Sequence, residues 1–226
     1  MCKNSILYFL LFSVVLYSCN KKEGSTFSAA GSLLSGENSA SAESKELNPS
    51  DLVKYVQSAE NGLKQKSKRD EVIYSAFYKP LDYIICREEE SEEITKQTAE
   101  QKRKELEEMQ YIDMKVEIEN TEGEFIRYGN PSAEEYSHRI NYCSFQMQKD
   151  IFLVEGDDTL ACGLFHFERT YDIAPYATFL LGFPLKKEKQ NKDKVLVFND
   201  RLFNKGTMRF VFKNEDIKKT PLLKTI

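Results

Sequence analysis

Most of the chain after residue 50 consists of short segments that are rich in β-branched and aromatic residues and are bounded by turn residues. Such residues favour the pleated, half-buried surface of a sheet, and the Gly, Asn, Asp and Pro residues between them favour turns. Strands joined by turns predict antiparallel pairing, because a parallel sheet needs crossover connections, usually helices. The expected strands are Glu71–Lys79, Tyr83–Arg87, Met114–Ile118, Glu124–Tyr128, Ile151–Glu155, Thr159–Glu168, Tyr176–Phe183, Lys194–Phe198 and Thr207–Phe212.

Helices are expected at three places. Asn48 followed by Pro49 is typical of a helix start, with Asn as the cap and Pro at the first helical position, and Gly62 favours its end. The same pair at Asn130-Pro131 predicts a second helix, and the charged segment Glu88–Gln110 is strongly helix-favouring. The predicted fold class is therefore mainly β with accessory helices (α+β), built as an antiparallel β-sandwich.

The start of the chain has the features of a secretory signal peptide. Lys3 supplies the positive charge, the uncharged run Ile6–Leu16 follows, and the small residue Ser18 precedes Cys19. The run has 11 residues, whereas a helix that spans a bilayer needs about 20. We therefore interpret residues 1–18 as a cleaved signal peptide.

The tetrad Leu16-Tyr17-Ser18-Cys19 resembles the lipobox of bacterial lipoproteins. In that family a diacylglyceryl group is joined to the cysteine sulfur, and the chain is cut just before that cysteine. The resemblance implies that Cys19 carries a lipid anchor of the palmitate type in the cell envelope. An Asp after the cysteine favours inner-membrane retention in well-studied lipoproteins, and Asn20 stands there in this chain. The expected location is the outer membrane, facing the periplasm.

Residues 19–50 are rich in Ser, Ala, Gly and Glu, a composition that favours a disordered tether between the lipid and a folded domain. Residues 51–226 are enough for a single globular β-rich domain. The whole chain resembles Bacteroidetes lipoproteins to which no activity is assigned. Its second half is loosely similar to immunoglobulin-like modules, on the final segments "KVLVF" and "TMRFVF".

Composition argues against several kinds of partner and chemistry. The formal net charge of −4 lacks the basic excess of a nucleic-acid-binding surface. No phosphate loop, nucleophile elbow or metalloprotease motif is present, and the chain has only two histidines, so we predict no cofactor, no metal and no catalytic residue. Cys86, Cys143 and Cys162 either include one bridged pair or are three buried thiols, and their apolar neighbours favour burial.

The densest group of functional residue types lies where an expected strand passes into a loop. Arg169 there could hold a carboxylate or phosphate, and Tyr171 and Tyr176 could stack on a sugar or peptide. Alternatively, Glu168, Arg169 and Asp172 form a structural ion-pair network, with Tyr171 packed beside them. The possible binding residues are His166, Glu168, Arg169, Tyr171, Asp172 and Tyr176.

These features predict a membrane-anchored envelope lipoprotein that acts as a non-enzymatic interaction or assembly module with an envelope protein partner. A glycan or small-ligand binding lipoprotein is the first alternative. An envelope hydrolase that uses carboxylates such as Glu168 and Asp172 is the second.

Overall fold

The computed structural model describes residues 45–186 and 191–226, which all belong to the unit formed by residues 42–226. The predicted signal peptide, Cys19 and the predicted tether up to residue 44 lie outside the described residues. None of the helices in the described part is long and apolar enough to cross a membrane. The protein is mainly β with a few helices, and its two larger sheets are antiparallel, as the turn-linked segments predict.

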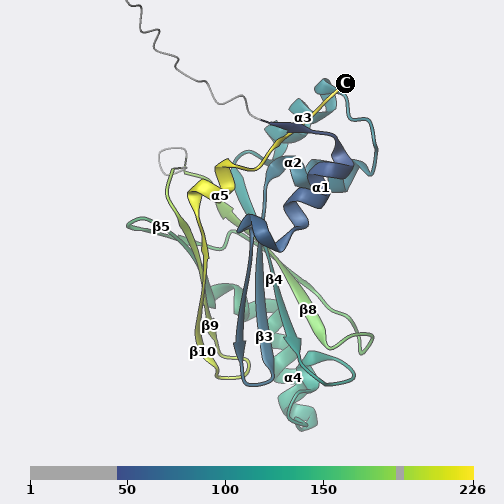
Figure 1. The fold of residues 1–226 in the computed structure, drawn as a ribbon. Coiled ribbons are helices and arrows are strands. Elements are labelled where there is room, and N and C mark those ends of the chain that lie inside the picture. Colours follow the sequence, from purple (N-terminus) through teal and green to yellow (C-terminus); the bar gives the residue numbers. More distant parts are fainter. Residues whose placement is uncertain (1–44, 187–190) are drawn as a thin grey trace, which may run out of the picture. The chain divides into compact units, whose positions relative to one another are not determined.

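The larger sheet is five-stranded and carries the central part of the fold (Figure 1). Each of its neighbouring pairs is antiparallel, and β4 lies in the middle with the longest ladders on both sides. Its strands, in spatial order, are β2 (Lys64–Arg69), β3 (Val72–Lys79), β4 (Met109–Ile118), β8 (Tyr176–Pro184) and β7 (Leu164–Glu168).

The second sheet has four strands, and a short parallel pair lies apart from both sheets. The turn at Gly156-Asp157 joins residues 151–155 to residues 158–161 as a hairpin of the second sheet, as predicted, with Glu155 opposite Asp158. The order is β10 (Gly206–Phe212), β9 (Lys194–Asp200), β5 (Ile151–Glu155) and β6 (Asp158–Ala161), and the short pair is β1 (Glu46–Leu47) with β11 (Leu222–Leu223).

The core lies where the buried faces of the two sheets contact each other. The Tyr74 and Phe198 rings lie 6.1 Å apart, and those of Tyr78 and Phe212 lie 5.8 Å apart. Tyr74 also donates a hydrogen bond of 2.7 Å to Asp200 across the same interface. Because strand side chains alternate between faces, these contacts leave the opposite face of the five-stranded sheet outside the core.

Helices gather at both ends of the five-stranded sheet. Figure 1 shows α1 (Pro49–Gln57), α2 (Leu81–Glu89) and α3 (Lys96–Leu106) at one end, and α4 (Ala133–Asn141) at the other. Arg103 of α3 bonds both oxygens of Asp82 on α2, at 2.7 and 3.0 Å, which ties these two helices together. The remaining short elements are η1 (Ala59–Asn61), η2 (Phe125–Arg127), η3 (Tyr142–Gln146), η4 (Met147–Asp150) and α5 (Asn214–Lys218).

The predicted start of α1 is confirmed. The Asn48 side chain accepts a hydrogen bond from the backbone N–H of Asp51 at 2.9 Å, and Pro49 occupies the first helical position. Leu52 and Val56, four residues apart, point into the core. The predicted helix end at Gly62 is wrong, because α1 ends at Gln57; Gly62 instead caps the following turn η1 in the left-handed region, at φ +70°.

The predicted strand Tyr83–Arg87 is wrong, because these residues lie in helix α2. Pro80 stands at its N-cap, and the buried residues Asp82, Ile85 and Cys86 recur at helical spacing. A short apolar run of this length suits a buried strand or a buried helix equally well. Packing against α1 and α3 decides for the helix here.

Three further predictions need correction. Glu124–Tyr128 is mostly the single turn η2 rather than a strand. Phe125 and Ile126 are adjacent and both buried, whereas neighbouring residues of a half-buried strand point to opposite faces. Thr159–Glu168 divides at Cys162-Gly163, and its second half joins the other sheet as β7. The predicted helix Glu88–Gln110 shortens to α3, where Thr95 provides the cap.

The helix after Asn130-Pro131 forms, but its cap is not Asn130. Ser132 accepts a hydrogen bond from the N–H of Glu135, and the Glu135 carboxylate accepts one from the N–H of Ser132. This reciprocal pair is a capping box, and it places the first helical residue at Ala133. Asn130 instead adopts a left-handed turn conformation at φ +51°.

Candidate functional site

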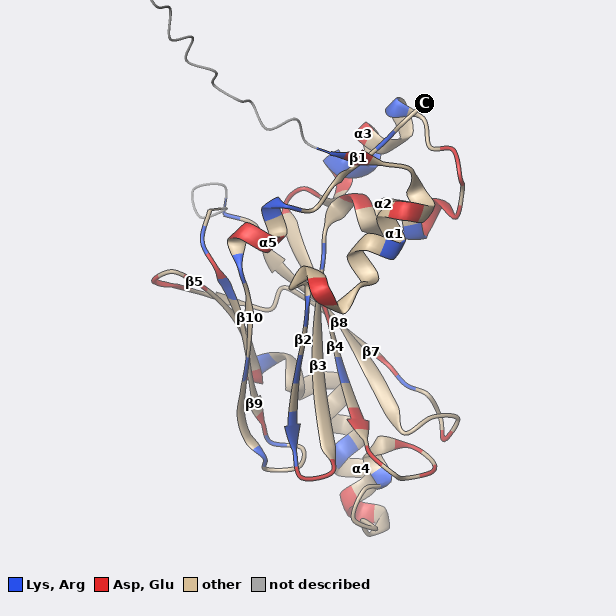
Figure 2. Cartoon of the chain, viewed as in Figure 1, with Lys and Arg blue, Asp and Glu red and all other residues tan. Residues whose placement is uncertain are grey.

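The outer face of the five-stranded sheet carries two adjacent rows of paired side chains. The register places Lys66, Ser75, Lys115 and Thr178 side by side on β2, β3, β4 and β8. The neighbouring row contains Lys64, Phe77 and Asp113 on the first three of these strands. Figure 2 shows how Lys and Arg recur along β2. One row is therefore built of ammonium and hydroxyl groups, and the other joins an aromatic ring to one lysine and one acid.

These rows line a hollow of about 450 Å³ that opens to solvent. This volume falls within the roughly 300–1,000 Å³ that is usual for small-ligand sites. Much of its wall is apolar, because Phe77 and two alanines line it together with the aliphatic stems of the lysines. The lining residues are Ala59, Lys64, Gln65, Lys66, Ser75, Ala76, Phe77, Asp113, Lys115 and Thr178.

Helices α1 and α2 hold the Phe77 ring in place. Tyr83 of α2 packs its ring edge-on against Phe77 at 5.3 Å between centroids. Gln57 of α1 donates a hydrogen bond of 3.2 Å to the Tyr83 hydroxyl. The aromatic side of the hollow is thus supported from behind by two packed elements, which favours a preformed site.

Lys64 lies over this ring without a carboxylate partner. Its Nζ lies 5.0 Å from the centroid of Phe77 and donates a hydrogen bond of 2.6 Å to the Gln57 carbonyl oxygen. Burial lowers the pKa of Lys64 from its ordinary value, since desolvation disfavours the charged form. Across residues 45–186 and 191–226, neither Lys64 nor Lys66 forms an ion pair, so their charge is available to a ligand.

Asp113 is the acid in the hollow. Its Oδ1 lies 2.6 Å from Nζ of Lys79, which stands on β3 beside it. Burial raises the pKa of Asp113, the Lys79 charge opposes that rise, and the Glu168 charge adds to it. Asp113 is therefore a partly desolvated carboxylate with one fixed cationic partner.

The structure divides the residues that the sequence predicts for binding into two groups. His166 and Glu168 stand exposed on the outer face of β7. Tyr176 lies on the same face of β8, where Nζ of Lys115 lies 4.0 Å from its ring centroid. This first group lies on the same face as the hollow, although none of the three lines it.

The second group belongs to the loop between β7 and β8. Arg169 donates to both oxygens of Glu124, which is fully buried, and the Tyr136 hydroxyl joins the same cluster. Hydrogen bonding to Glu124 raises the pKa of Arg169, which keeps the guanidinium charged. An ion-pair network is present, as the alternative interpretation predicts, but Glu124 rather than Glu168 is the partner of Arg169.

Asp172, in the same loop, is also bonded to groups within the chain. Nε of Arg127 donates to its Oδ1 at 2.9 Å, and the N–H of Glu124 donates to the same oxygen at 3.1 Å. Tyr171 stacks on the Arg169 guanidinium at 4.6 Å while it remains 69% exposed, so it is not packed into the core. The loop charges are thus committed to neighbours within the chain.

The thiols offer no nucleophile. Cys86, Cys143 and Cys162 are free and buried, as their apolar neighbours predict. Burial raises the pKa of Cys86 and of Cys162 to about 11, and it raises that of Cys143 further. A thiol with a raised pKa stays protonated at neutral pH and is a poor nucleophile. In the described ranges no group of His, Cys, Asp and Glu has the arrangement of a metal site.

Sequence reasoning did not find the hollow. A signal was present in Lys64-Gln65-Lys66-Ser67-Lys68, where lysines alternate with smaller polar residues as on one face of a strand. That pattern does not say which residues of other strands stand beside the lysines. Comparison with protein families, with curated proteins and with solved structures found no match for this chain.

Proposed function

We propose that this chain is a lipid-anchored cell-envelope protein whose folded domain is a non-enzymatic binding module. The anchor rests on the lipobox-like tetrad that ends at Cys19, and the expected place is the outer membrane, facing the periplasm. Binding rests on one observation, which is the preformed hollow on the outer sheet face with two lysines that lack carboxylate partners. The buried thiols, with their raised pKa values, support a role without covalent catalysis.

The finer architecture is part of this proposal. Ring contacts between Tyr74 and Phe198, and between Tyr78 and Phe212, support a β-sandwich in which the two sheets are the layers. The hairpin of β9 and β10 supports the loosely immunoglobulin-like second half. In such a sandwich the outer face of the five-stranded sheet is one of the two surfaces left for a partner or ligand, and it is the one that carries the hollow.

The anchor is tested by fatty-acid labelling in cells. Wild-type chain should incorporate labelled palmitate and run as a processed form, and Cys19→Ala should remain unlabelled as the longer precursor. Labelling of the Cys19→Ala chain would exclude this residue as the lipid site.

The binding face is tested by site-specific photocrosslinking in intact cells. A photoreactive residue at Thr178, which lines the hollow, should give adducts. The matched position is Thr207 on β10, an exposed threonine in the other sheet, which should give none. Equal adduct yields at the two positions, or none at Thr178, would contradict the proposal.

An envelope hydrolase is the second candidate, and one observation favours it. Asp113 has a raised pKa in the hollow, and the Glu168 charge is close enough to contribute. Two carboxyl groups, one of them with a raised pKa, could act as general acid and base. The earlier pair of Glu168 with Asp172 is not supported, because Asp172 is bound to Arg127. Hydrolysis of glycoside or ester substrates by wild type but not by Asp113→Asn would establish this candidate.

A further inference from the structure

We infer that the hollow on the five-stranded sheet binds a small amphipathic monocarboxylate, with the acid group on the row Lys66–Ser75–Lys115–Thr178 and the apolar body against Phe77. This inference rests on the proposed binding function and names the class of ligand for the same site. The acid-binding groups and Phe77 lie on paired strands whose register is fixed by the ladder of the sheet.

The acid-binding row has the right groups at the right spacing. Lys66 and Lys115 flank Ser75 across neighbouring strands, so their Cα atoms lie about 10 Å apart by the usual strand separation. The Lys66 side chain is long enough to reach an anion above Ser75, whereas Nζ of Lys115 lies 2.9 Å from Oε2 of Glu117 and would turn away from that carboxylate to join it. In the part of the chain that the structure describes, the Ser75 and Thr178 hydroxyls and the Lys66 ammonium have no hydrogen-bond partner.

The apolar side of the hollow is the part that would contact the apolar body of the ligand. Phe77 and Ala59 present carbon surface, and Tyr83 fixes the ring from behind. Burial of apolar ligand surface against such a wall contributes affinity. Lys64 extends over the ring, with its Nζ 5.0 Å from the ring centroid, and donates a hydrogen bond to the Gln57 carbonyl oxygen.

The site suits a carboxylate better than a phosphate. Phosphate sites commonly use arginine forks or free backbone N–H groups at a helix N-terminus, and the lining residues supply neither. The strand N–H groups beneath the hollow are engaged in the sheet ladder. Asp113 within the hollow and Glu117 beside Lys115 would oppose a second negative charge on the ligand.

The inference is tested by equilibrium dialysis of the full lipidated chain in phospholipid nanodiscs, with empty nanodiscs as the blank. The probe is radiolabelled 4-phenylbutyrate, a soluble monocarboxylate with an aromatic body. Its alcohol and amine analogues, 4-phenylbutan-1-ol and 4-phenylbutylamine, should bind at least about 5-fold more weakly, because each lacks the ion pair with lysine.

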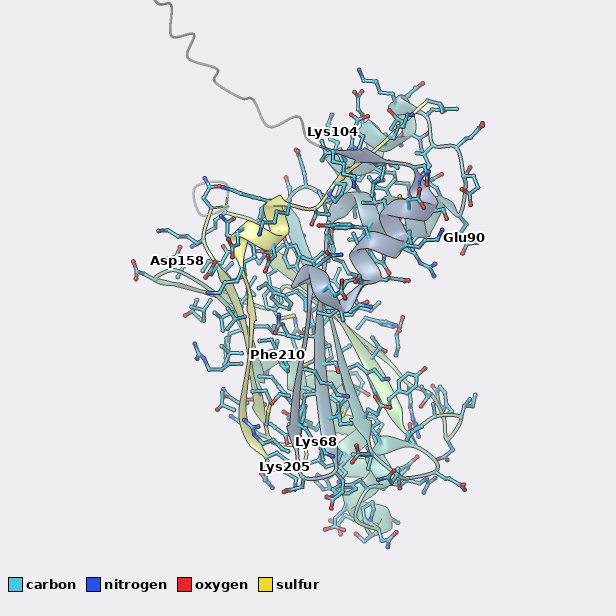
Figure 3. The ribbon with its side chains drawn as sticks, in the orientation of Figure 1. Lys68, Glu90, Lys104, Asp158, Lys205 and Phe210 are labelled. Atoms are coloured by element: carbon cyan, nitrogen blue, oxygen red, sulfur yellow. The ribbon has the colours of Figure 1, made fainter. Side chains whose placement is uncertain are left out.

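Two charge reversals on β2 provide the matched variants. Lys66→Glu should weaken binding of 4-phenylbutyrate about tenfold, since it replaces an attraction by a repulsion. Lys68→Glu makes the same change of net charge on the same face and strand, outside the hollow; it also breaks the exposed ion pair of Lys68 with Glu119, and it should leave binding unchanged. Figure 3 places Lys68 at the end of β2 that lies away from α1 and α2.

Three results would overturn the inference. The first is equal binding of the acid, the alcohol and the amine. The second is an equal loss of binding in the two lysine variants, which would indicate a long-range charge effect. The third is crosslinking at Thr178 to a partner protein together with no binding of 4-phenylbutyrate, in which case the binding module stands and the monocarboxylate does not.

Discussion

The loop cluster around Glu124 and the hollow around Ser75 differ in how their charges are satisfied. In the loop, Arg169 is bonded to a fully buried carboxylate, and Asp172 is bonded to Arg127 and to a backbone N–H. In the hollow, Lys64 and Lys66 have no carboxylate partner within the described ranges. Removal of one partner from a buried ion pair costs stability, whereas charges that are left unpaired at a concave surface are available to a ligand.

The same two regions also differ in their backbone. The loop places two consecutive non-glycine residues, Tyr171 and Asp172, in the left-handed region at φ +48° and +64°. Such conformations cost free energy and persist where neighbouring contacts hold them. The hollow lies on regular strands with a continuous ladder, so its geometry needs no such support.

The largest expected effect is on stability, from the loop cluster. Arg169→Met should lower the free energy of unfolding by about 3 kcal/mol, because it leaves Glu124 buried without a cation. Urea unfolding measures this loss. The control is Arg209→Met, an exposed arginine on β10 with no ion pair among the described residues, which should change stability by less than about 0.5 kcal/mol. Similar losses in both variants would remove the distinction between the two regions.

Phe77→Ala should have an intermediate effect. The ring is half-buried and packs on Tyr83, so its removal should cost about 1.5 kcal/mol, roughly half the loss for a fully buried phenylalanine. The same variant should also lose binding of the carboxylate probe. Phe145→Ala, at a phenylalanine that is 74% exposed, serves as the control for both measurements and should change neither. Retained binding in Phe77→Ala would place the apolar body of the ligand elsewhere.

Lys66→Met should hardly change stability while it weakens binding. Its ammonium has no partner in the described part of the chain, so the free energy of unfolding should change by less than about 0.5 kcal/mol. Thermal unfolding without ligand, followed by the same scan with 4-phenylbutyrate, separates the two effects. A clear loss of stability without ligand would mean that Lys66 is a structural residue.

The smallest expected effect is the pH dependence of the loop. Hydrogen bonding to Arg127, and then to the Glu124 N–H, lowers the pKa of Asp172 below its ordinary value. This carboxylate therefore stabilises the loop above about pH 4, and the stabilisation is lost as the pH falls through the lowered pKa. Amide exchange of the loop from pH 5 to pH 2 measures it, with Asp172→Asn as a variant that should show no such dependence.

The fold could be predicted where local patterns decide it. The cap at Asn48, the alternation in β4 and the hairpin turn at Gly156-Asp157 each carry their own physical cause, and each formed as expected. Tyr83–Arg87 failed because its apolar run suits either a strand or a helix, and contacts with α1 and α3 decide. Thr159–Glu168 failed because the change of sheet at Cys162-Gly163 depends on partners far away in the sequence.

The site was harder to predict for a related reason. The segment Phe165–Tyr176 contains many functional residue types close together in sequence, but the structure pairs its Arg169 with Glu124 and its Asp172 with Arg127. The hollow is assembled from four strands, and its acid-binding row exists only through the register of Lys66, Ser75, Lys115 and Thr178. Sequence pattern predicts a strand and its faces, whereas cross-strand register follows from the tertiary packing.

The most direct test of the binding site is to identify what the protein carries from its own membrane. The lipidated chain would be extracted in polymer nanodiscs, and the small molecules that remain bound would be measured by mass spectrometry. Wild type and Lys68→Glu should carry the same amphipathic monocarboxylate, and Lys66→Glu should carry much less of it. An identical set of bound molecules in all three chains would contradict the assignment of the hollow as the binding site.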